Sequence, residues 1–248
     1  MSAAASILNL AAYKFVTLED PALLRARLME EAQAAALKGS ILLAEEGINF
    51  FLAGDAAAAR AFLSMLRRDR RFADLHAKES WSRTQPFRRL RVKLKREIIR
   101  MDHPTIRPAA ARAPALDSTT LARWLDAGRC EAGRPLLMLD TRNGFEVDAG
   151  RFVGALDWRL ERFGDFPAAL AAHRATLEGK TVVSYCTGGI RCEKAALLMR
   201  EQGLEHVLQL DGGILQYFET VGGHHYEGGC FVFDERGTLD ARLQPSPA

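Results

Sequence analysis

One cysteine stands where a buried strand should turn into a helix. Cys186 follows the apolar run 181–185, and a helical pattern occupies residues 193–199. Backbone N–H groups at a helix start are free to donate, and the helix adds partial positive charge there. Both effects stabilise a thiolate: a thiol of pKa ~8.5 is about 3% ionised at neutral pH, whereas one shifted to ~6.5 is about three-quarters ionised. The pattern therefore predicts a nucleophilic sulfur.

The residues after Cys186 favour this chemistry over a purely structural cysteine. They include two glycines and end at Arg191, and apolar packing explains neither feature. We predict that Arg191 braces the loop through a carboxylate, Asp140 or Glu146, in preference to touching the substrate. We also predict that backbone N–H groups of the loop stabilise an anion. The residues of this anion-binding loop are Thr187, Gly188, Gly189 and Ile190.

The other three cysteines have weaker claims to chemistry. Cys192 could resolve a sulfenic acid or persulfide on Cys186, or it could be a small helix residue facing the core. Cys130 and Cys230 are expected to be structural. No pair has CxxC spacing, which disfavours a zinc ribbon. So few cysteines in a chain of 248 residues do not indicate a disulfide scaffold, and a reducing cytoplasm is the expected compartment.

The sequence gives little support for a metal or a nucleotide cofactor. His224 and His225 could bind a metal, but adjacent residues rarely hold one ion without further ligands, and no HxxxH or HxD pattern supplies them. A Gly-x-Gly-x-x-Gly fingerprint is also missing from the sequence. We therefore predict no metal site and no evident cofactor.

The elements that must position Cys186 alternate between strands and helices. Caps near Ser118 begin a helix that runs to Ala127, and strands are predicted at 136–139, 181–185 and 206–210. Strands separated by helices are typical of a doubly wound parallel sheet.

The first hundred residues predict a different fold. Strands are expected near 11–16, 41–44, 48–52 and 88–95, with one helix from Asp20 to Leu37 that Gly39 ends, and another that Asp55 caps and that reaches Arg68. The order β-α-β-β-α-β is that of a ferredoxin-like α+β sandwich. The turn 45–49 is either a hairpin connection with Gly47 at positive φ, or a place where Glu46 or Asn49 contacts substrate.

We therefore divide the chain into four parts. Three prolines among residues 103–114 indicate a linker. No stretch approaches the ~20 apolar residues of a membrane span, and Met1–Leu10 lacks the layout of a signal peptide. The parts are a ferredoxin-like RNA-binding domain at 1–102, the linker at 103–116, a doubly wound domain at 117–226 and a C-terminal extension at 227–248.

Charge is divided unevenly between these parts. Residues 1–100 hold 18 basic and 11 acidic side chains, and residues 101–248 hold 16 and 20. The run 88–96 alternates apolar and basic residues with period two, so Leu90, Val92 and Leu94 should pack on one face. The opposite face would then carry four positive charges.

Two explanations fit this basic strand. Like charges on one strand face repel, so a phosphate backbone explains them better than stability does. Alternatively, the strand lies at an edge and uses its charges to prevent aggregation. Aromatic residues nearby, Phe72, Trp81 and Phe87, could stack on unpaired bases or could be core. The predicted RNA-binding residues are Arg89, Arg91, Lys93, Lys95, Arg67 and Arg68.

The second module resembles a rhodanese domain. Residues 139–146 resemble the Asp-x-Arg-x-x-x-Glu element of that family, and residues 150–155 its Gly-x-Ile-x-Gly-Ala element. The Cys186 loop and residues 210–214 complete the set in the same order. Four residues separate Cys186 from Arg191, as in sulfur-handling members, whereas related phosphatases carry five. The resemblance implies that Asp140, Arg142 and Glu146 brace the loop.

The whole chain, from about residue 10 to 240, resembles the TrhO family of tRNA uridine hydroxylases. The similarity rests on residues 46–49, 186–194 and 228–236. It implies oxygen-dependent conversion of the wobble uridine, position 34 of the tRNA anticodon loop, to 5-hydroxyuridine. Molecular oxygen would be the co-substrate, and the electron donor is unknown. The enzyme would act in the cytoplasm with no membrane partner; the oligomeric state stays open, with a monomer as one alternative.

Two other functions stay open on the sequence alone. A sulfurtransferase could move sulfur from thiosulfate or a persulfide to a thiol without an RNA substrate, but this leaves the basic strand unexplained. A non-catalytic RNA-binding or scaffold protein would keep only the fold, and the intact Cys186 and Arg191 count against it.

Overall fold

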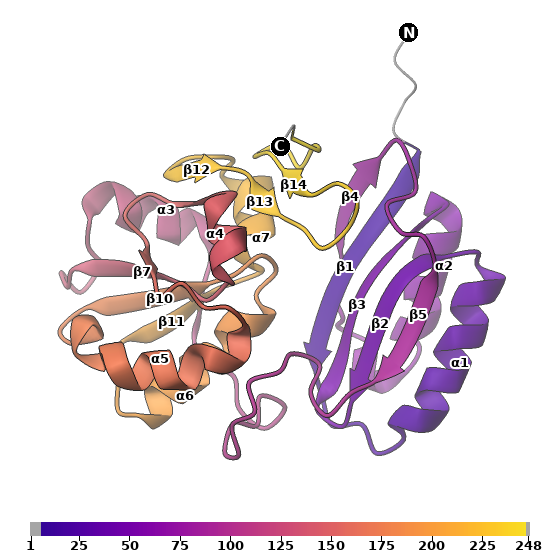
Figure 1. Cartoon of the computed structure of the whole chain (residues 1–248), viewed down its shortest axis with the longest axis horizontal. Coiled ribbons are helices and arrows are strands. Elements are labelled where there is room, and N and C mark those ends of the chain that lie inside the picture. The colour runs from indigo at the N-terminus through magenta and orange to yellow at the C-terminus, as the bar shows by residue number, and fades with distance from the viewer. Residues whose placement is uncertain (1–5, 247–248) are drawn as a thin grey trace, which may run out of the picture. The chain divides into compact units, whose positions relative to one another are not determined.

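The computed structural model describes residues 6–246, and the chain divides into two compact units (Figure 1). The first unit comprises the chain up to Ile98 together with Phe233–Arg236. The second comprises Ile99–Val232 and the residues from Gly237 onward.

The first unit is the predicted ferredoxin-like sandwich with one additional strand. The sheet order is β4-β1-β3-β2-β5, in which β5 runs parallel to β2 and the other neighbours are antiparallel. Both helices cover one face of this sheet (Figure 1). The elements are β1 (Ile7–Phe15), α1 (Pro21–Ala34), β2 (Lys38–Ala44), β3 (Gly47–Gly54), α2 (Ala56–Arg67), a short 3-10 helix η1 (Arg70–Phe72), β4 (Lys78–Ser82) and β5 (Leu90–Leu94).

The basic strand occupies a different place from the predicted one. We expected it to be the last ferredoxin strand, but that strand is β4, whose polar sequence KESWS hides it from pattern analysis. β5 lies at the edge of the sheet beyond β2. Its Val92 is buried as predicted, whereas Leu94, which we expected to pack, is 46% exposed.

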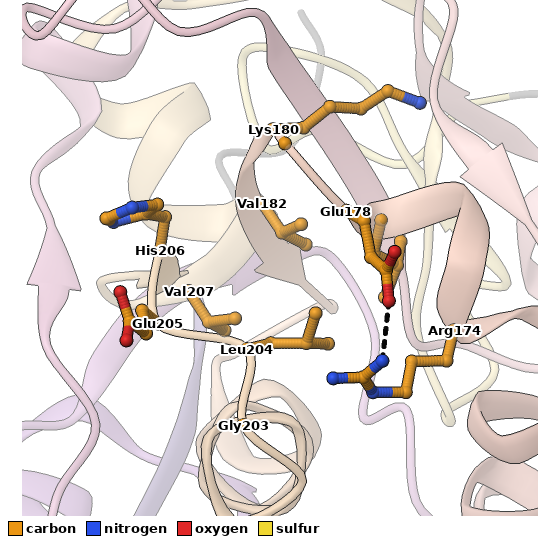
Figure 2. Close-up of a pocket in the computed structure, with 11 residues that line it drawn as sticks. Arg174, Glu178, Lys180, Val182, Gly203, Leu204, Glu205, His206 and Val207 are labelled. Atoms are coloured by element: carbon orange, nitrogen blue, oxygen red, sulfur yellow. Dashed lines mark hydrogen bonds and ion pairs between the residues drawn. The ribbon is translucent and has the colours of Figure 1, made fainter.

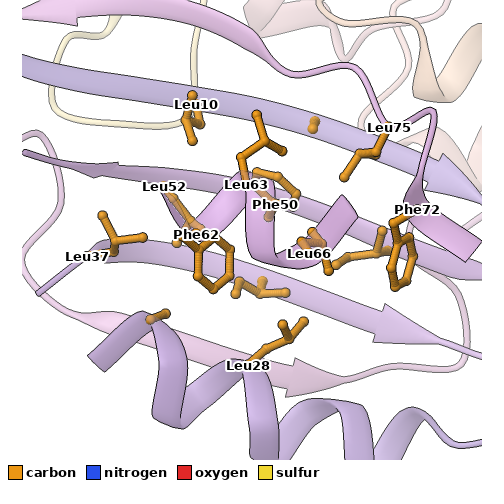
Figure 3. Packing of buried hydrophobic residues seen from close by; sticks show 14 of the residues in the cluster. Leu10, Leu28, Leu37, Phe50, Leu52, Phe62, Leu63, Leu66, Phe72 and Leu75 are labelled. Atoms are coloured by element: carbon orange, nitrogen blue, oxygen red, sulfur yellow. The ribbon is translucent and has the colours of Figure 1, made fainter. Parts of the chain in front are cut away.

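Leucine and phenylalanine side chains fill the space between the sheet and its helices (Figure 3). Asp55 caps α2 as predicted, since its carboxylate accepts a hydrogen bond from the Ala58 N–H at 3.0 Å. Asp20 precedes α1 but makes no side-chain cap, because its carboxylate pairs with Arg71 instead.

Two glycines of this unit stand where a side chain could not. Gly39 does not end α1 as expected; it lies within β2 at φ 135°, and an added Cβ would come 2.0 Å from the Phe51 carbonyl oxygen. Gly47 begins β3 at φ 146°, as the hairpin interpretation predicts. Beside it, the Glu46 carboxylate accepts the Ile98 N–H at 2.7 Å and the Asn49 amide donates to the Ile98 carbonyl at 3.3 Å. These bonds favour the structural role for both side chains.

The second unit contains the predicted parallel sheet, with strand order β6-β11-β10-β7-β9. Its elements up to the Cys186 loop are β6 (Ala115–Leu116), α3 (Ser118–Ala127), β7 (Leu136–Asp140), α4 (Gly144–Asp148), β8 (Gly150–Phe152), β9 (Leu156–Asp157), η2 (Phe163–Asp165), α5 (Phe166–His173), η3 (Arg174–Leu177) and β10 (Thr181–Tyr185). After the loop come α6 (Ile190–Glu201), β11 (Val207–Leu210), α7 (Gly213–Thr220), β12 (Tyr226–Gly228), β13 (Cys230–Phe231) and β14 (Thr238–Leu239).

The domain boundaries differ from those expected at 103–116 and 227–248. The first of these segments is not a free linker, because Ile106 and Ala113 are buried in the core of the second unit and its end forms β6. The extension also belongs to a fold: β12 pairs with β8, and β13 pairs with β14. Buried apolar side chains, which a proline-rich composition conceals, account for the difference.

Candidate active site around Cys186

The cysteine loop joins the central strand β10 to α6. Cys186 directly follows β10, and Gly189 turns the chain at φ 101° so that α6 begins at Ile190. The Gly189 N–H donates to the Cys186 Sγ at 3.2 Å. Cys186 itself is completely buried, with 0% of its surface exposed.

The environment of Cys186 favours the thiolate despite its burial. Burial alone raises the pKa of the thiol. A hydrogen bond from Cys192, the charge of Arg191 and the N–H groups of both these residues lower the pKa by more than burial raises it, so that the pKa is about 5. The sulfur is therefore ionised at neutral pH. The backbone donors are Gly189, Cys192 and Arg191. Among the described residues of the predicted anion-binding loop, Gly189 is the one whose N–H donates to the sulfur.

Cys192 is fully buried on the first turn of α6. Its Sγ donates to the Gly189 carbonyl oxygen at 2.9 Å and lies 4.0 Å from the Gln209 side-chain oxygen, and its hydrogen bond to Cys186 lowers the pKa of that thiol. Burial and the neighbouring Cys186 raise the pKa of Cys192 well above that of an ordinary thiol. One cysteine is thus poised as a base or nucleophile and the other as a proton donor.

Arg191 is held by Glu146, one of the two predicted partners. Its two terminal nitrogens donate to the two carboxylate oxygens at 2.5 and 2.7 Å. Glu146 also accepts the Asn143 N–H at 3.0 Å, which fixes the carboxylate at the start of α4. Because this planar two-bond contact occupies the guanidinium, the geometry supports bracing over substrate contact.

Asp140 braces the site through Arg142 instead. Their side chains are completely buried, and the Arg142 Nη2 lies 2.6 Å from the Asp140 carboxylate. The same nitrogen donates to the Gly150 carbonyl at 2.7 Å, so the pair links the end of β7 to β8. The pKa of Arg142 stays well above its ordinary value: burial lowers it, but the charge of Asp140 more than compensates.

The start of α7 holds the cysteine loop from its other side. The Ile214 N–H donates to the Cys186 carbonyl at 3.0 Å, and the Leu215 N–H to the Thr187 carbonyl at 3.1 Å. A Cβ on Gly213 would lie 2.4 Å from the Cys186 carbonyl oxygen. No individual role is predicted for this glycine from the sequence, although a Gly-Gly pair directly before a helical pattern signals such a close approach.

The sulfur is less accessible than a nucleophile for a tRNA base should be. The nucleophilic sulfur that the sequence predicts must be reachable by its substrate, and the complete burial of Cys186 contradicts this for the free thiolate. Gly188, at the tip of the loop, is partly exposed, and a Cβ added there would meet nothing within 4 Å. Open space therefore begins beside the loop tip and not at the sulfur.

The low pKa of Cys186 predicts a titration that can be observed directly. The ultraviolet absorbance of the thiolate, taken as wild type minus Cys186→Ser, should rise with a midpoint at pH about 5. A midpoint near the ordinary thiol value of ~8.5 would contradict the electrostatics described above. Because the pKa is depressed in the folded state, this ionisation stabilises the fold at high pH. That contribution should be lost as the pH falls from ~8.5 towards 5.

The predicted RNA-binding residues fall into two groups. The four predicted RNA-binding residues on β5 and its flanks are exposed, and so is Arg68 at the end of α2. Arg67 is instead half-buried, and its guanidinium donates to the Leu75 carbonyl at 2.7 and 2.9 Å. Phe72 is completely buried, so it belongs to the core and cannot stack on a base as it stands. The exposed group comprises Arg68, Arg89, Arg91, Lys93 and Lys95.

The cross-strand register brings polar and aromatic residues together with this basic strand. Arg91 pairs with Ser40 and Ser40 with Phe51, so an arginine and an aromatic ring share one row. Lys93 and Asn49 share the next row across Leu42. Since Val92 is buried on the helix side, alternation places these residues on the face that the helices leave open.

A cavity of about 250 Å³ in the second unit lies away from this chemistry (Figure 2). Its lining includes Lys180, Val182 and Val207, which stand at the beginnings of β10 and β11. Cys186 follows the opposite end of β10. Ligands of open parallel sheets bind outside the carboxyl ends of the strands, so this cavity is not the candidate site.

Comparison with known proteins assigns both units and the whole chain. Residues 7–98 match the UPF0176 acylphosphatase-like domain and residues 120–220 the rhodanese-like domain. A tRNA uridine(34) hydroxylase from Variovorax paradoxus is 66% identical over 98% of this chain and 92% of its own. The chain belongs to the tRNA uridine(34) hydroxylase family. A family member from Delftia acidovorans is 64% identical over 97% of this chain, and one from Bordetella petrii 63% over 98%.

Among solved structures, the rhodanese-like domain of an Anabaena protein overlaps 54% of this chain and 86% of its own, at 22% identity and a TM-score of 0.39. Within residues 6–246, no helix is both long and apolar enough to cross a membrane.

Proposed function

We propose that this protein hydroxylates uridine 34 of tRNA to 5-hydroxyuridine in the cytoplasm, with Cys186 as the reacting group and molecular oxygen as co-substrate. The family membership over nearly the full chain is the observation that carries this proposal. The ionised Cys186 supports it, because uracil C6 is attacked by thiolates and the resulting ring is electron-rich at C5.

The chemistry needs a nucleophile, an oxygen source and electrons. Addition of the thiolate to C6 makes C5 able to accept an oxygen atom, and loss of the C5 proton with release of the thiolate restores the ring. If O₂ supplies the atom, two electrons and two protons from a reductant convert the second oxygen to water. Backbone N–H groups around Cys186 stabilise the negative charge on sulfur before addition and after release.

Burial of the sulfur favours a variant in which Cys186 is first loaded as a persulfide: the thiolate takes a sulfane sulfur from thiosulfate, and sulfite leaves, or from a donor persulfide, and the donor thiol leaves. The new S–S bond places the outer sulfur ~2.05 Å beyond the buried Cys186 sulfur. Intact-protein mass spectrometry of enzyme isolated under non-reducing conditions tests this step. A mass increase of one sulfur atom that Cys186→Ser abolishes supports the persulfide. A protein that is unmodified and fully active would contradict the persulfide and support direct attack by the thiolate.

The open sheet face of the first unit is proposed to bind the anticodon loop. Arg91 and Lys93 supply positive charge there, and Phe51 supplies a ring in the same row as Arg91. This combination suits unpaired RNA, whose phosphates and bases are both accessible.

Reversing Arg91 and Lys93 to glutamate should weaken tRNA binding and flatten its salt dependence. If four basic residues contact phosphates, log affinity falls with log salt at a slope of about −3, at ~0.7 per contact. The double variant should lose about 1.4 of that slope. Reversal of the exposed Arg129 and Arg200, both on the second unit, is the matched control and should leave binding unchanged. Equal losses in both pairs would contradict this assignment of the RNA-binding face.

The deciding experiment is nucleoside mass spectrometry of tRNA from cells that lack the gene. Loss of 5-hydroxyuridine and its derivatives, restored by the wild-type gene and not by Cys186→Ser, is the expected result. Loss of thiolated bases with normal 5-hydroxyuridine would favour the sulfurtransferase instead.

A further inference from the structure

A second group of reactive side chains lies in the second unit at the surface, formed by Asp126, His224 and His225. The ligand atoms of these three residues all lie within 4.8 Å of one another. The Nε2 atoms of His224 and His225 stand 2.8 and 2.7 Å from the same Asp126 oxygen, Oδ1. Asp126 lies in the last turn of α3, and both histidines lie between α7 and β12.

Two adjacent histidines normally point to opposite sides of an extended chain, but here they converge. His225 adopts φ 58°, a left-handed conformation that turns its ring towards that of His224. The ring centroids lie 4.0 Å apart. The backbone is held on both residues: the Tyr217 hydroxyl donates to the His224 carbonyl, and the Val153 N–H donates to the His225 carbonyl, each at 2.9 Å.

The third ligand removes the objection that the sequence raised against a metal at this pair. Asp126 is 98 residues from His224 in the chain, so no local motif could reveal it. The site combines two imidazole nitrogens and one carboxylate oxygen, a donor set that divalent zinc accepts in proteins.

We propose that Asp126, His224 and His225 bind one zinc ion, with solvent at the fourth position. Tetrahedral coordination at about 2.0 to 2.1 Å requires ligand atoms about 3.3 Å apart. From 2.8 and 2.7 Å, the two histidine nitrogens need to move away from the Asp126 oxygen by only about half an ångström. All three side chains retain exposed surface, at 59, 53 and 28% respectively, so an ion can enter from solvent. The ion would join the end of α3 to the segment leading into β12.

The test is titration of the full chain with ZnCl₂ in isothermal calorimetry. Every protein carries Cys186→Ser, so that the thiolate cannot bind the ion. We expect one zinc site per chain. Asp126→Asn and His225→Asn should each lower the affinity for zinc on the order of 10²-fold. Asparagine is chosen at position 225 because it tolerates the left-handed backbone. His206→Asn, an exposed histidine elsewhere in the same unit, is the matched control and should bind as tightly as the parent.

Two further readouts make the result unambiguous. Zinc should raise the thermal midpoint of the parent and of His206→Asn, but not that of the two ligand variants. Cobalt(II) in place of zinc should give visible d–d absorption without a thiolate charge-transfer band, since no sulfur is involved. Equal zinc affinity in all variants, a thiolate band, or no saturable site would each overturn the proposal.

Discussion

Hydroxylation should be lost when Cys186 is replaced by serine. Serine keeps the size of the side chain, but a hydroxyl is not ionised at neutral pH and cannot add to uracil as a thiolate does. Because both the thiolate and the persulfide routes begin at this sulfur, we expect the rate to fall on the order of 10³-fold or more. The measurement is formation of 5-hydroxyuridine in unmodified tRNA by the purified variant.

Cys130→Ser is the matched control for this experiment. Cys130 is also buried, but it lies before β7 and its sulfur accepts a hydrogen bond from the Thr181 hydroxyl, which a serine oxygen can replace. Activity close to that of the wild type is expected. Retention of hydroxylation by Cys186→Ser, with normal folding, would exclude both chemical routes.

Replacing Glu146 with glutamine should give the second large effect, on stability. The exchange removes the carboxylate charge that pairs directly with Arg191, and both side chains are buried. Breaking a buried pair at one partner costs about 3–5 kcal/mol, because the remaining charge loses its direct partner. Urea denaturation should therefore show a free energy of unfolding lower by that amount.

Asp148→Asn offers a control on the same short helix. Asp148 also pairs with an arginine, Arg159, at 2.6 Å, but both side chains are more than half exposed. Solvent screens this pair, so little change in stability is expected. If the two substitutions destabilise the protein equally, Glu146 does not have the bracing role described here.

Local patterns were sufficient to predict the elements around the cysteine. The strand at 181–185 agrees with β10, because an apolar run marks it; the helix predicted over 193–199 lies within α6, which begins earlier, at Ile190, directly after the turn at Gly189. The Arg191–Glu146 pair was also foreseen as one of two choices. The choice itself depended on Asp140 being occupied by Arg142, which no spacing reveals.

Features that depend on distant contacts were missed. The polar residues of β4 hide this strand from pattern analysis. The sequence therefore predicts the basic strand as the last strand of the ferredoxin-like sheet, a position that β4 occupies. The close approach of Gly213 to the Cys186 carbonyl comes from the start of α7, an element about which the strand pattern says nothing. Asp126 is invisible as a partner of His224 for the same reason.

The return of residues 233–236 to the first unit means that neither unit is a single stretch of chain. Within that unit, the Arg236 guanidinium donates to the Ser80 hydroxyl at 2.7 Å and the Glu235 N–H to the Pro86 carbonyl at 3.2 Å. The polypeptide thus passes between the units three times. A recombination event that exchanged only one half would leave the other half without part of its own fold, so the two halves are expected to be inherited as one piece.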